Sequence, residues 1–323
     1  MKLDARIYVA GHTGLVGSAL HRALSLQGHT DLLTRTRNEL DLLNTAAVSR
    51  FFEETRPEFV FLAAAKVGGI LANATCPADF LRDNLLIQNN VMEASRAAGV
   101  NRLLFLGSSS VYPRDAVQPI SETALLTGPL EATNRPYALA KIAGIEMCWS
   151  YNRQYGTQYL AAMPSNLYGL GDRFNPQNSH VLPALVRKTA EAIETAAKAI
   201  EIWGSGTPRR EFLYADDLAA ACLFLMNLPN ESYQSLLAQD QPPLINIGTG
   251  EDVTIRELAE TIADIMGFKG ELLFDASKPD GTPRKVMDVR RIHALGWRPT
   301  VTLRDGIQRV VREFNDSRMT REC

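Results

Sequence analysis

The sequence has little cysteine, no long apolar run and no N-terminal segment of the kind that directs secretion. Its 323 residues include four cysteines, and these form neither a CxxC pair nor a metal-ligand spacing, so we predict no disulfide scaffold and no metal site. No apolar run approaches the roughly 18 residues of a membrane span, and the start of the chain lacks the apolar region of about 7 to 15 residues found in signal peptides. We therefore expect a soluble, cytoplasmic protein without a membrane partner.

An excess of charge of either sign is also missing. Lysine and arginine number 34 against 36 aspartates and glutamates, which gives a net charge of −2. No overall field therefore favours nucleic acid or an anionic membrane as a partner, and any anionic ligand must be bound by local groups. Hydrophobic residues make up 46% and charged residues 22%, as in ordinary soluble globular proteins.

Short apolar runs alternate with segments of helical period through the first half of the chain. Strands are predicted at 6–10, 30–35, 59–65, 102–108 and 159–169, and helices at 14–27, 45–55, 77–98 and 137–155. This alternation predicts an α/β fold with a doubly wound parallel Rossmann sheet.

The second half is less regular and predicts a smaller C-terminal α/β substrate lobe. After Gly171 come an Asn/Pro-rich loop, the short strand EIWG at 201–204 and helices near 181–199, 215–228, 254–266 and 302–315. We expect a nucleotide-binding domain over residues 1–170, to which later segments return. Residues 171–323 would form mainly the substrate lobe.

A glycine-rich turn follows the first predicted strand and opens the next helix. Gly11, Gly14 and Gly17 stand in VAGHTGLVG with G-x-x-G-x-x-G spacing. The helix N-terminus offers unpaired N–H groups and a partial positive charge to a pyrophosphate, and glycines let the backbone approach it. Glycines also serve ordinary strand-to-helix turns, but the position after the first strand favours a dinucleotide site.

Two arginines stand at the end of the second predicted strand. Arg35 and Arg37 occupy a stretch, 33–38, that contains no acidic residue. Dinucleotide sites place an acid here for the ribose of NAD or an arginine for the 2′-phosphate of NADP, and a guanidinium pairs with phosphate in a bidentate manner. We predict NADPH as the cofactor, with two solvated loop arginines as the alternative. Asp41 is a candidate for contact with the adenine or for a helix-start acid.

Tyr137 and Lys141 lie one helical turn apart in PYALAKIAG, so they share a helix face. Ser108 ends the preceding strand, at the edge where doubly wound sheets bind ligands. A ketone that accepts hydride needs a proton at its oxygen. A tyrosine supplies that proton if a neighbouring ammonium lowers its pKa from about 10, while a second hydroxyl polarises the carbonyl. We therefore predict a reductase in which Lys141 lowers the pKa of Tyr137 and holds the nicotinamide ribose.

Longer segments resemble the extended short-chain dehydrogenase/reductase family, in its branch that acts on sugar nucleotides. They are GHTGLVGSA, LAAAKVGGILAN, FLGSSSVYP, NRPYALAKIAGIEMCWSYNRQYG, MPSNLYG, NPQNSHVLPAL, IWGSGTPRREFLYADDLA and KPDGTPRKVMDVRRIHALGW. The resemblance covers nearly the whole chain. It implies a bifunctional enzyme that uses NADPH to epimerise GDP-4-keto-6-deoxy-D-mannose at C3 and C5 and to reduce it at C4, giving GDP-L-fucose. It also implies a homodimer paired through the helices at 77–98 and 137–155.

The resemblance assigns roles to individual residues. Ser108, Tyr137 and Lys141 are the reductase set, and His180 is the acid that serves epimerisation, since imidazole exchanges protons near neutral pH. The residues implied in cofactor contacts are Gly11, His12, Thr13, Gly14, Leu15, Val16, Gly17, Arg35, Arg37, Asp41, Leu106, Gly107, Lys141, Pro164, Ser165, Asn166, Leu167 and His180. Those implied in holding the GDP-sugar are Lys188, Trp203, Arg210 and Asp280.

Physical chemistry agrees with part of this substrate set. An indole can stack on guanine, and Arg210 with Lys188 can neutralise a pyrophosphate. An ordinary packing role is the alternative for Trp203, and we expect Arg209 to be a solvated neighbour.

Two positions depart from the family pattern. Ser110 stands where the family typically has a cysteine, which pairs with the histidine in the proton transfers at C3 and C5. Serine has a far higher pKa than a thiol, so a reductase without full epimerisation is the alternative function. Thr13 stands where the family often has an arginine that reaches the 2′-phosphate, which leaves that contact to Arg35 and Arg37. A non-catalytic NADPH sensor is a third hypothesis, against which the intact reductase set argues.

Overall fold

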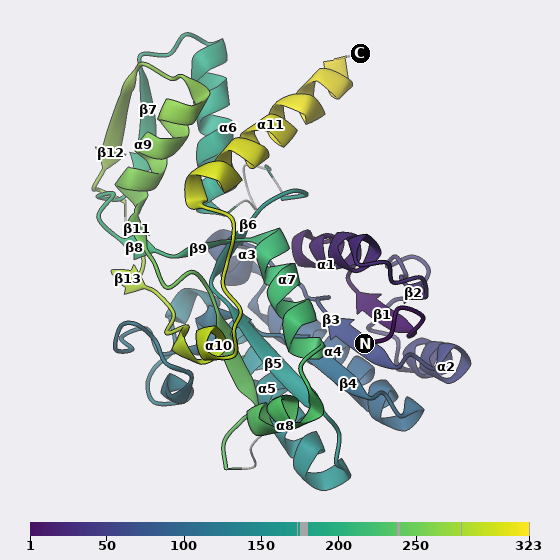
Figure 1. Cartoon of the computed structure of the whole chain (residues 1–323). Helices are drawn as coiled ribbons and strands as arrows, with labels where there is room; N and C mark the ends of the chain where they lie inside the picture. The colour runs from purple at the N-terminus through teal and green to yellow at the C-terminus, as the bar shows by residue number, and fades with distance from the viewer. Residues whose placement is uncertain (173, 175–179, 238–239, 279, 323) are drawn as a thin grey trace.

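A parallel six-stranded sheet forms the centre of the computed structural model, which describes residues 1–172, 174, 180–237, 240–278 and 280–322 (Figure 1). The strands are β1 (Ile7–Ala10), β2 (Leu32–Leu33), β3 (Phe59–Leu62), β4 (Arg102–Leu106), β5 (Tyr159–Pro164) and β10 (Leu244–Ile247). Their order is β10-β5-β4-β3-β1-β2, and every neighbouring pair is parallel. The predicted doubly wound sheet is confirmed. The chain reverses direction across the sheet between β1 and β3, where such folds bind ligands at the carboxyl ends of the strands.

Helices cover both faces of this sheet. On one side α1 (Leu15–Leu26) packs against α7 (Ala215–Met226), and on the other α4 (Pro77–Ala98) packs against α2 (Thr45–Thr55) and α5 (Arg135–Tyr155). The strands between them are mostly apolar and, apart from the half-buried β2, largely buried, as parallel strands covered on both faces usually are. Shorter elements near the sheet are α3 (Ile70–Thr75), α8 (Asn230–Leu236), α10 (Arg290–Ala294), η1 (Ser109–Val111), η2 (Glu122–Ala124) and η3 (Ala132–Asn134).

A second apolar core lies in the upper part of Figure 1. It is built by α6 (Val181–Glu194), β7 (Ala199–Trp203), α9 (Ile255–Met266), β12 (Glu271–Asp275) and α11 (Leu303–Glu322), with β7 and β12 paired in parallel. Small sheets join the two cores: β6 (Asn166–Tyr168) pairs with β9 (Phe212–Tyr214), and β8 (Arg209–Arg210) lies between β11 (Val253–Thr254) and β13 (Arg284–Lys285). The helix α7 and the strand β10 pack in the first core, so the chain crosses between the cores several times. The domain boundary at 170/171 stays a proposal.

The observed elements agree with the predicted ones within a few residues where local signals are strong. The helix α4 has Pro77 in its first turn and ends at Gly99, whose φ is 75°. A Thr254–Glu257 capping box opens α9. The predicted strand at 30–35 shortens to Leu32–Leu33, and most of the predicted Asn/Pro-rich loop, residues 173 and 175–179, lies outside the described residues. Within the part of the chain that the structure describes, no helix is both long and apolar enough to cross a membrane.

Two of the three glycines in the first turn are required by packing. Gly11 has a φ of 86°, and a Cβ there would lie 2.7 Å from the Ala64 backbone. A Cβ on Gly17 would lie 2.0 Å from the carbonyl oxygen of Gly11. At Gly14 the same atom would meet only ordinary contact, 3.5 Å from that oxygen. The turn therefore closes on Gly11 and Gly17, while Gly14 leaves its outer side open.

Gly17→Ala should destabilise the protein by about 1–3 kcal/mol, because the added methyl group overpacks the turn. Gly14→Ala is the matched control and should leave the melting temperature nearly unchanged. Thermal unfolding followed by circular dichroism measures both. Equal melting temperatures for the two variants would contradict this account of the turn.

Candidate functional site

The N-terminus of α1 forms an open cradle for an anion. Gly14 is the N-cap residue, and its backbone is extended with no side-chain cap, so the first N–H groups of the helix have no side-chain acceptor. His12 has a buried Nδ1 atom without a hydrogen-bond partner in the described structure. A helix N-terminus, an open glycine and an unpartnered buried ring nitrogen fit a dinucleotide pyrophosphate. The predicted residues His12 to Gly17 are thus placed together here.

The predicted 2′-phosphate site is exposed beside this cradle. The guanidinium of Arg35 lies 5.3 Å from the ring centroid of Phe51, and Arg37 and Thr13 are exposed. An acid just beyond the stretch 33–38, Glu39, accepts hydrogen bonds from the backbone and hydroxyl of Thr36, which lower the pKa of its carboxyl. These bonds hold the carboxylate on its own turn. Asp41 likewise accepts from the backbone of Leu43.

The predicted hydroxyl, phenol and amine come together at the carboxyl end of β4. Ser108 opens η1, and its hydroxyl is hydrogen-bonded to the phenol of Tyr137. The Ser110 hydroxyl and backbone N–H both donate to Ser108 Oγ, at 2.9 and 3.2 Å. Lys141 Nζ donates to the carbonyl of Leu106 at 2.7 Å and lies 5.8 Å from the Tyr137 ring centroid. Two lone pairs of Ser108 are thereby used, so Ser108 is the donor in its bond to the phenol oxygen and Tyr137 keeps its own proton to give.

The predicted lowering of the Tyr137 pKa is wrong in direction. Burial raises the pKa of Tyr137 to about 12, and the hydrogen bond to Ser108 is what opposes this rise. Burial also lowers the pKa of Lys141 to about 7, since the side chain is only 3% exposed. Desolvation is the largest cause of the shift for both groups. The phenol is therefore fully protonated near neutral pH, the state that a proton donor needs.

The end of β5 supplies the remaining predicted cofactor residues. Gly107 has no space for a side chain, because its Cβ would lie 2.3 Å from the Met163 sulfur. The Ser165 hydroxyl, in the segment Pro164 to Leu167, is buried without a hydrogen-bond partner in the described structure. Asn166 Nδ2 donates to the carbonyl of Glu211 at 2.7 Å. Two segments distant in sequence therefore meet beside Lys141, and the unpartnered hydroxyl leaves a donor for a ligand.

His180 stands at the start of α6, a helix of the second core. It is the exposed N-cap residue of α6, and its side chain makes no capping hydrogen bond. It does not line the cavity next to Ser110. Its assignment as an acid stays a proposal.

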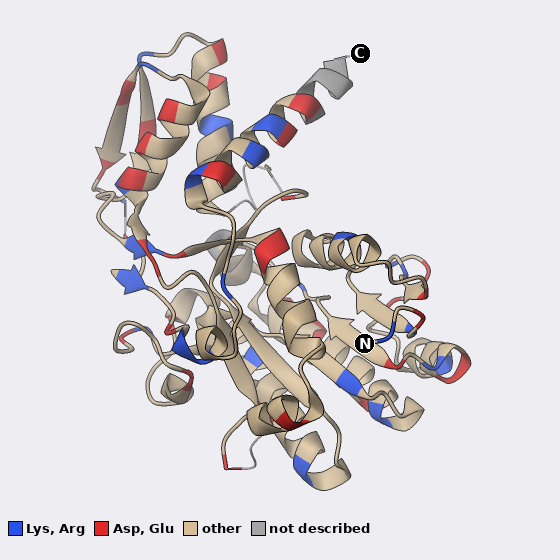
Figure 2. Ribbon diagram, in the orientation of Figure 1, with Lys and Arg blue, Asp and Glu red and all other residues tan. Residues whose placement is uncertain are grey.

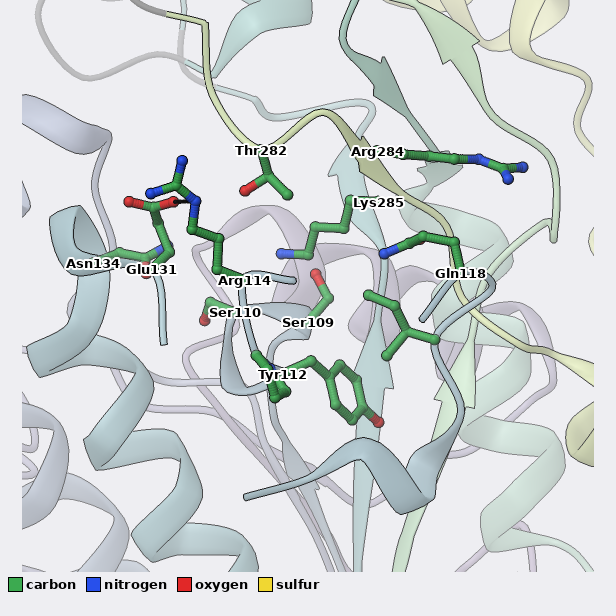
Figure 3. A pocket seen from close by; sticks show the side chains of 12 residues that line it. Ser109, Ser110, Tyr112, Arg114, Gln118, Glu131, Asn134, Thr282, Arg284 and Lys285 are labelled. Atoms are coloured by element: carbon green, nitrogen blue, oxygen red, sulfur yellow. Dashed lines mark ion pairs between the residues drawn. The ribbon is translucent and has the colours of Figure 1, made fainter. Parts of the chain in front are cut away.

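A cavity of about 60 Å³ lies on the outer side of the Ser108 cluster and contains a cation that the sequence analysis missed (Figure 3). Its lining includes Ser109, Ser110, Asn134 and Lys285, and Figure 3 shows the Lys285 amine pointing in toward Ser109 while Arg284 points away. Asn134 Oδ1 is buried without a partner. Burial, and repulsion from Arg210, lower the pKa of Lys285 to about 8. Lys285 lies in KPDGTPRK, but no local spacing indicated that it faces this cavity.

Two pairs of cations lie side by side on β8 and β13, and they differ in one respect. Arg209 is aligned with Arg284, and both guanidiniums bind the carboxylate of Asp252, at 2.7 and 2.5 Å. Arg210 is aligned with Lys285, and neither forms an ion pair with any described carboxylate. The basic residues of these strands are visible in Figure 2. Arg209 is therefore a structural ion-pair partner and not a solvated neighbour, while the second pair is left to bind an anion.

The other predicted substrate residues extend this cation pair toward the second core. Trp203 is 67% exposed, and two ammonium groups lie near its ring, Lys188 Nζ at 6.0 Å and Lys278 Nζ at 5.6 Å from the ring centroid. An exposed indole at the end of a strand is not an ordinary packing tryptophan. Asp280 accepts from the backbone and hydroxyl of Ser205 and so holds the turn after Trp203. From Ser110 to Trp203 the structure thus presents hydroxyls, two cations and an aromatic face.

Comparison with known proteins shows which family the chain resembles over most of its length. Residues 7–248 match the family described as the NAD dependent epimerase/dehydratase family. The chain is 54% identical to the GDP-L-fucose synthase of Escherichia coli over 311 residues, which are 96% of each chain. It is 53% identical to GDP-L-fucose synthase 1 of Arabidopsis thaliana over 94% of this chain and 91% of that one. Among solved structures, the GDP-mannoheptose C4 reductase from Campylobacter jejuni with NADP bound is 41% identical, with a TM-score of 0.88 over 98% of this chain and 99% of that one.

Arg35→Ala should weaken NADPH binding about tenfold or more, because a charge-assisted contact to the 2′-phosphate is lost. Binding of NADH, which lacks that phosphate, should stay unchanged. Arg37→Ala tests the neighbouring arginine in the same way. Fluorescence titration with both cofactors measures the change, and an Arg35→Ala variant that binds NADPH as wild type does would refute the role of Arg35.

Proposed function

The chain belongs to the NAD dependent epimerase/dehydratase family, and we propose that it is an NADPH-dependent epimerase/reductase that converts GDP-4-keto-6-deoxy-D-mannose to GDP-L-fucose. The observation that carries this function is the cluster of Ser108, Tyr137 and Lys141 beside the α1 cradle, in a chain so similar to GDP-L-fucose synthases. NADPH supplies the hydride for C4. The residues of the cradle, Arg35 and the segment Pro164 to Leu167 would hold it.

Reduction requires one proton at the C4 oxygen, and Tyr137 is placed to give it. The phenolic O–H bond breaks as the new O–H bond forms on the substrate, which leaves a phenolate. Because the pKa of Tyr137 is raised, the phenol stays protonated until negative charge develops on the C4 oxygen of the substrate. Ser108 donates its one free proton to the phenol or to the substrate carbonyl. Lys141, when protonated, stabilises the phenolate by electrostatic attraction.

The substrate is held along the strip that runs from Ser110 to Trp203. The deoxyhexose lies at the cavity, the diphosphate between Lys285 and Arg210, and the guanine on Trp203. A diphosphate supplies the negative charge with which the two unpaired cations can pair, and an aromatic face suits a purine ring. Local cations therefore bind an anion that a net charge of −2 does not attract.

Reduction without full epimerisation is the second candidate function, and one observation favours it. The Ser110 hydroxyl, which replaces the family thiol, donates its proton to Ser108. It therefore belongs to the reductase cluster and has no described basic group bonded to it. A neutral hydroxyl removes a proton from carbon poorly. Against this, His180 and the segment that follows it match the family.

Two further expectations stay proposals. A homodimer paired through α4 and α5 rests on the family resemblance, and light scattering at micromolar concentration tests it. A cytoplasmic location rests on the few, scattered cysteines.

Tyr137→Phe should keep NADPH binding and lower turnover of the keto-sugar by about 100-fold or more, because only the proton donor is removed. Tyr155→Phe, on the same helix, is the matched control and should react as wild type does. The absorbance of NADPH at about 340 nm follows its consumption, and NMR of the product shows the sugar that is formed. Near-normal turnover by Tyr137→Phe would refute its role, and wild type that binds NADPH without turnover would support the sensor hypothesis.

Exchange of substrate hydrogens with D2O distinguishes the two candidate functions and tests the role of Ser110. With NADP⁺ bound and reduction blocked, an epimerase should exchange the hydrogens at C3 and C5, which NMR detects, and this is the outcome we expect. Wild type that reduces the ketone without exchange would support the reductase alone. Ser110→Cys should then introduce exchange, because a thiol of pKa about 8.5 is partly ionised near neutral pH.

A further inference from the structure

Glu211 is a buried carboxylate that neither the cofactor site nor the proton donor uses. It stands between β8 and β9 and is 0% exposed. One oxygen accepts the N–H of Gly250 at 2.8 Å, and the other accepts the N–H of Met287 at 2.7 Å. Space is reserved for it, because a Cβ on Gly248 would lie 2.0 Å from Glu211 Oε1. Such a carboxylate carries a large desolvation cost unless it is matched by polar partners.

The backbone of Glu211 adds two connections to those of its side chain. Its N–H donates to the carbonyl of Lys285 at 3.3 Å, and its carbonyl accepts from Asn166 at 2.7 Å. Met287, which is bound by the carboxylate, lies two residues beyond Lys285. Arg210 precedes Glu211 directly. One residue therefore fixes both cations of the unpaired pair and links them to the β6 segment beside Lys141.

The charges around Lys285 are unbalanced without Glu211. Arg210 repels the ammonium, whereas Glu131 and Glu211 attract it. Arg114 and Arg284 also line the cavity, but Arg114 is paired with Glu131 and Arg284 with Asp252. Glu211 has no ion-pair partner of its own among the described residues, and burial raises the pKa of its carboxyl to about 7. Above this pKa the carboxylate is ionised and attracts the Lys285 ammonium, whereas Arg210 is attracted by Asp280.

We propose that Glu211 is a positioning residue that holds Lys285 and Arg210 side by side for a diphosphate, through its backbone hydrogen bonds and its negative charge. The identity of the ligand rests on the proposed function. The effect of Glu211 on Lys285 does not, since it follows from contacts within the protein. Two aligned cations repel one another, and a fixed carboxylate near Lys285 favours the charged form of its amine before the anion arrives.

Glu211→Gln removes the charge, and Asp217→Asn is the matched control. Asp217 is also a buried carboxylate, 4% exposed, and it accepts hydrogen bonds from Thr300 and Val301. No described cation forms an ion pair with it. Both variants therefore disturb a buried carboxylate network, but only Glu211→Gln changes the charge next to Lys285.

The first measurement follows the Lys285 amine by NMR of ¹³C-methylated lysines, with its resonance assigned by Lys285→Met. Glu211→Gln should lower the pH midpoint of this resonance, and Asp217→Asn should leave it as in wild type. Equal midpoints in all three proteins would overturn the proposal. This result does not depend on any substrate.

The second measurement is GDP binding by calorimetry between pH 7 and 9, with NADPH binding as an internal reference. At pH 8, Glu211→Gln should bind GDP about tenfold more weakly, or about 1.4 kcal/mol, and NADPH unchanged. If the glutamine variant does not fold, Glu211→Asp carries the test, since its shorter side chain releases the N–H groups of Gly250 and Met287 and should also weaken GDP binding. Wild-type GDP affinity in the folded variant would overturn the proposal. The proposed function alone would be refuted if the Lys285 amine titrates as expected in the wild type and its variants while the wild type neither binds GDP nor reduces the keto-sugar.

Discussion

Desolvation of charged and hydroxyl groups at the carboxyl edge of the sheet is the constraint on which the site depends. The β4 strand and α5 bury the Lys141 amine so completely that its pKa falls to about 7, while the pKa of the neighbouring phenol rises to about 12. Water at this position would return both groups to ordinary behaviour. The packed sheet therefore does more than support the site: it determines which group holds the proton.

One of the small sheets that join the two cores, formed by β8, β11 and β13, carries mostly polar side chains. Asp252 neutralises one pair of arginines on β8 and β13, which holds these strands together. The next pair in register, Arg210 and Lys285, forms no such ion pair with a described carboxylate, and Lys285 lines the cavity. The pairing of β8 with β13 thus places a structural ion-pair network at Arg209 and Arg284 and the proposed anion site at the next aligned pair. The local concentration of positive charge explains how a chain of net charge −2 can hold a diphosphate.

Ser110 joins the proton donor to the cavity. Its hydroxyl donates to Ser108, which leaves Ser108 with one proton to give. A thiol at this position would be a weaker donor and a better base, so the exchange of sulfur for oxygen shifts the residue from proton removal toward hydrogen bonding. The structure of the reductase cluster can accept either chemistry, because both need the same short 3₁₀ turn after β4.

The sequence by itself determined the features that local spacing encodes. The glycine turn, the Tyr137 and Lys141 pair and most helices follow from periodicities of a few residues, and the doubly wound sheet follows from their alternation. Tertiary structure alone decided the pKa order of Tyr137 and Lys141, because desolvation depends on what packs around a group and not on its neighbours in the chain. It also decided that Lys285 lies beside Arg210, 75 residues earlier in the chain, since pairing of β8 with β13 is a long-range event. No local pattern could predict that contact or the role of Glu211 behind it.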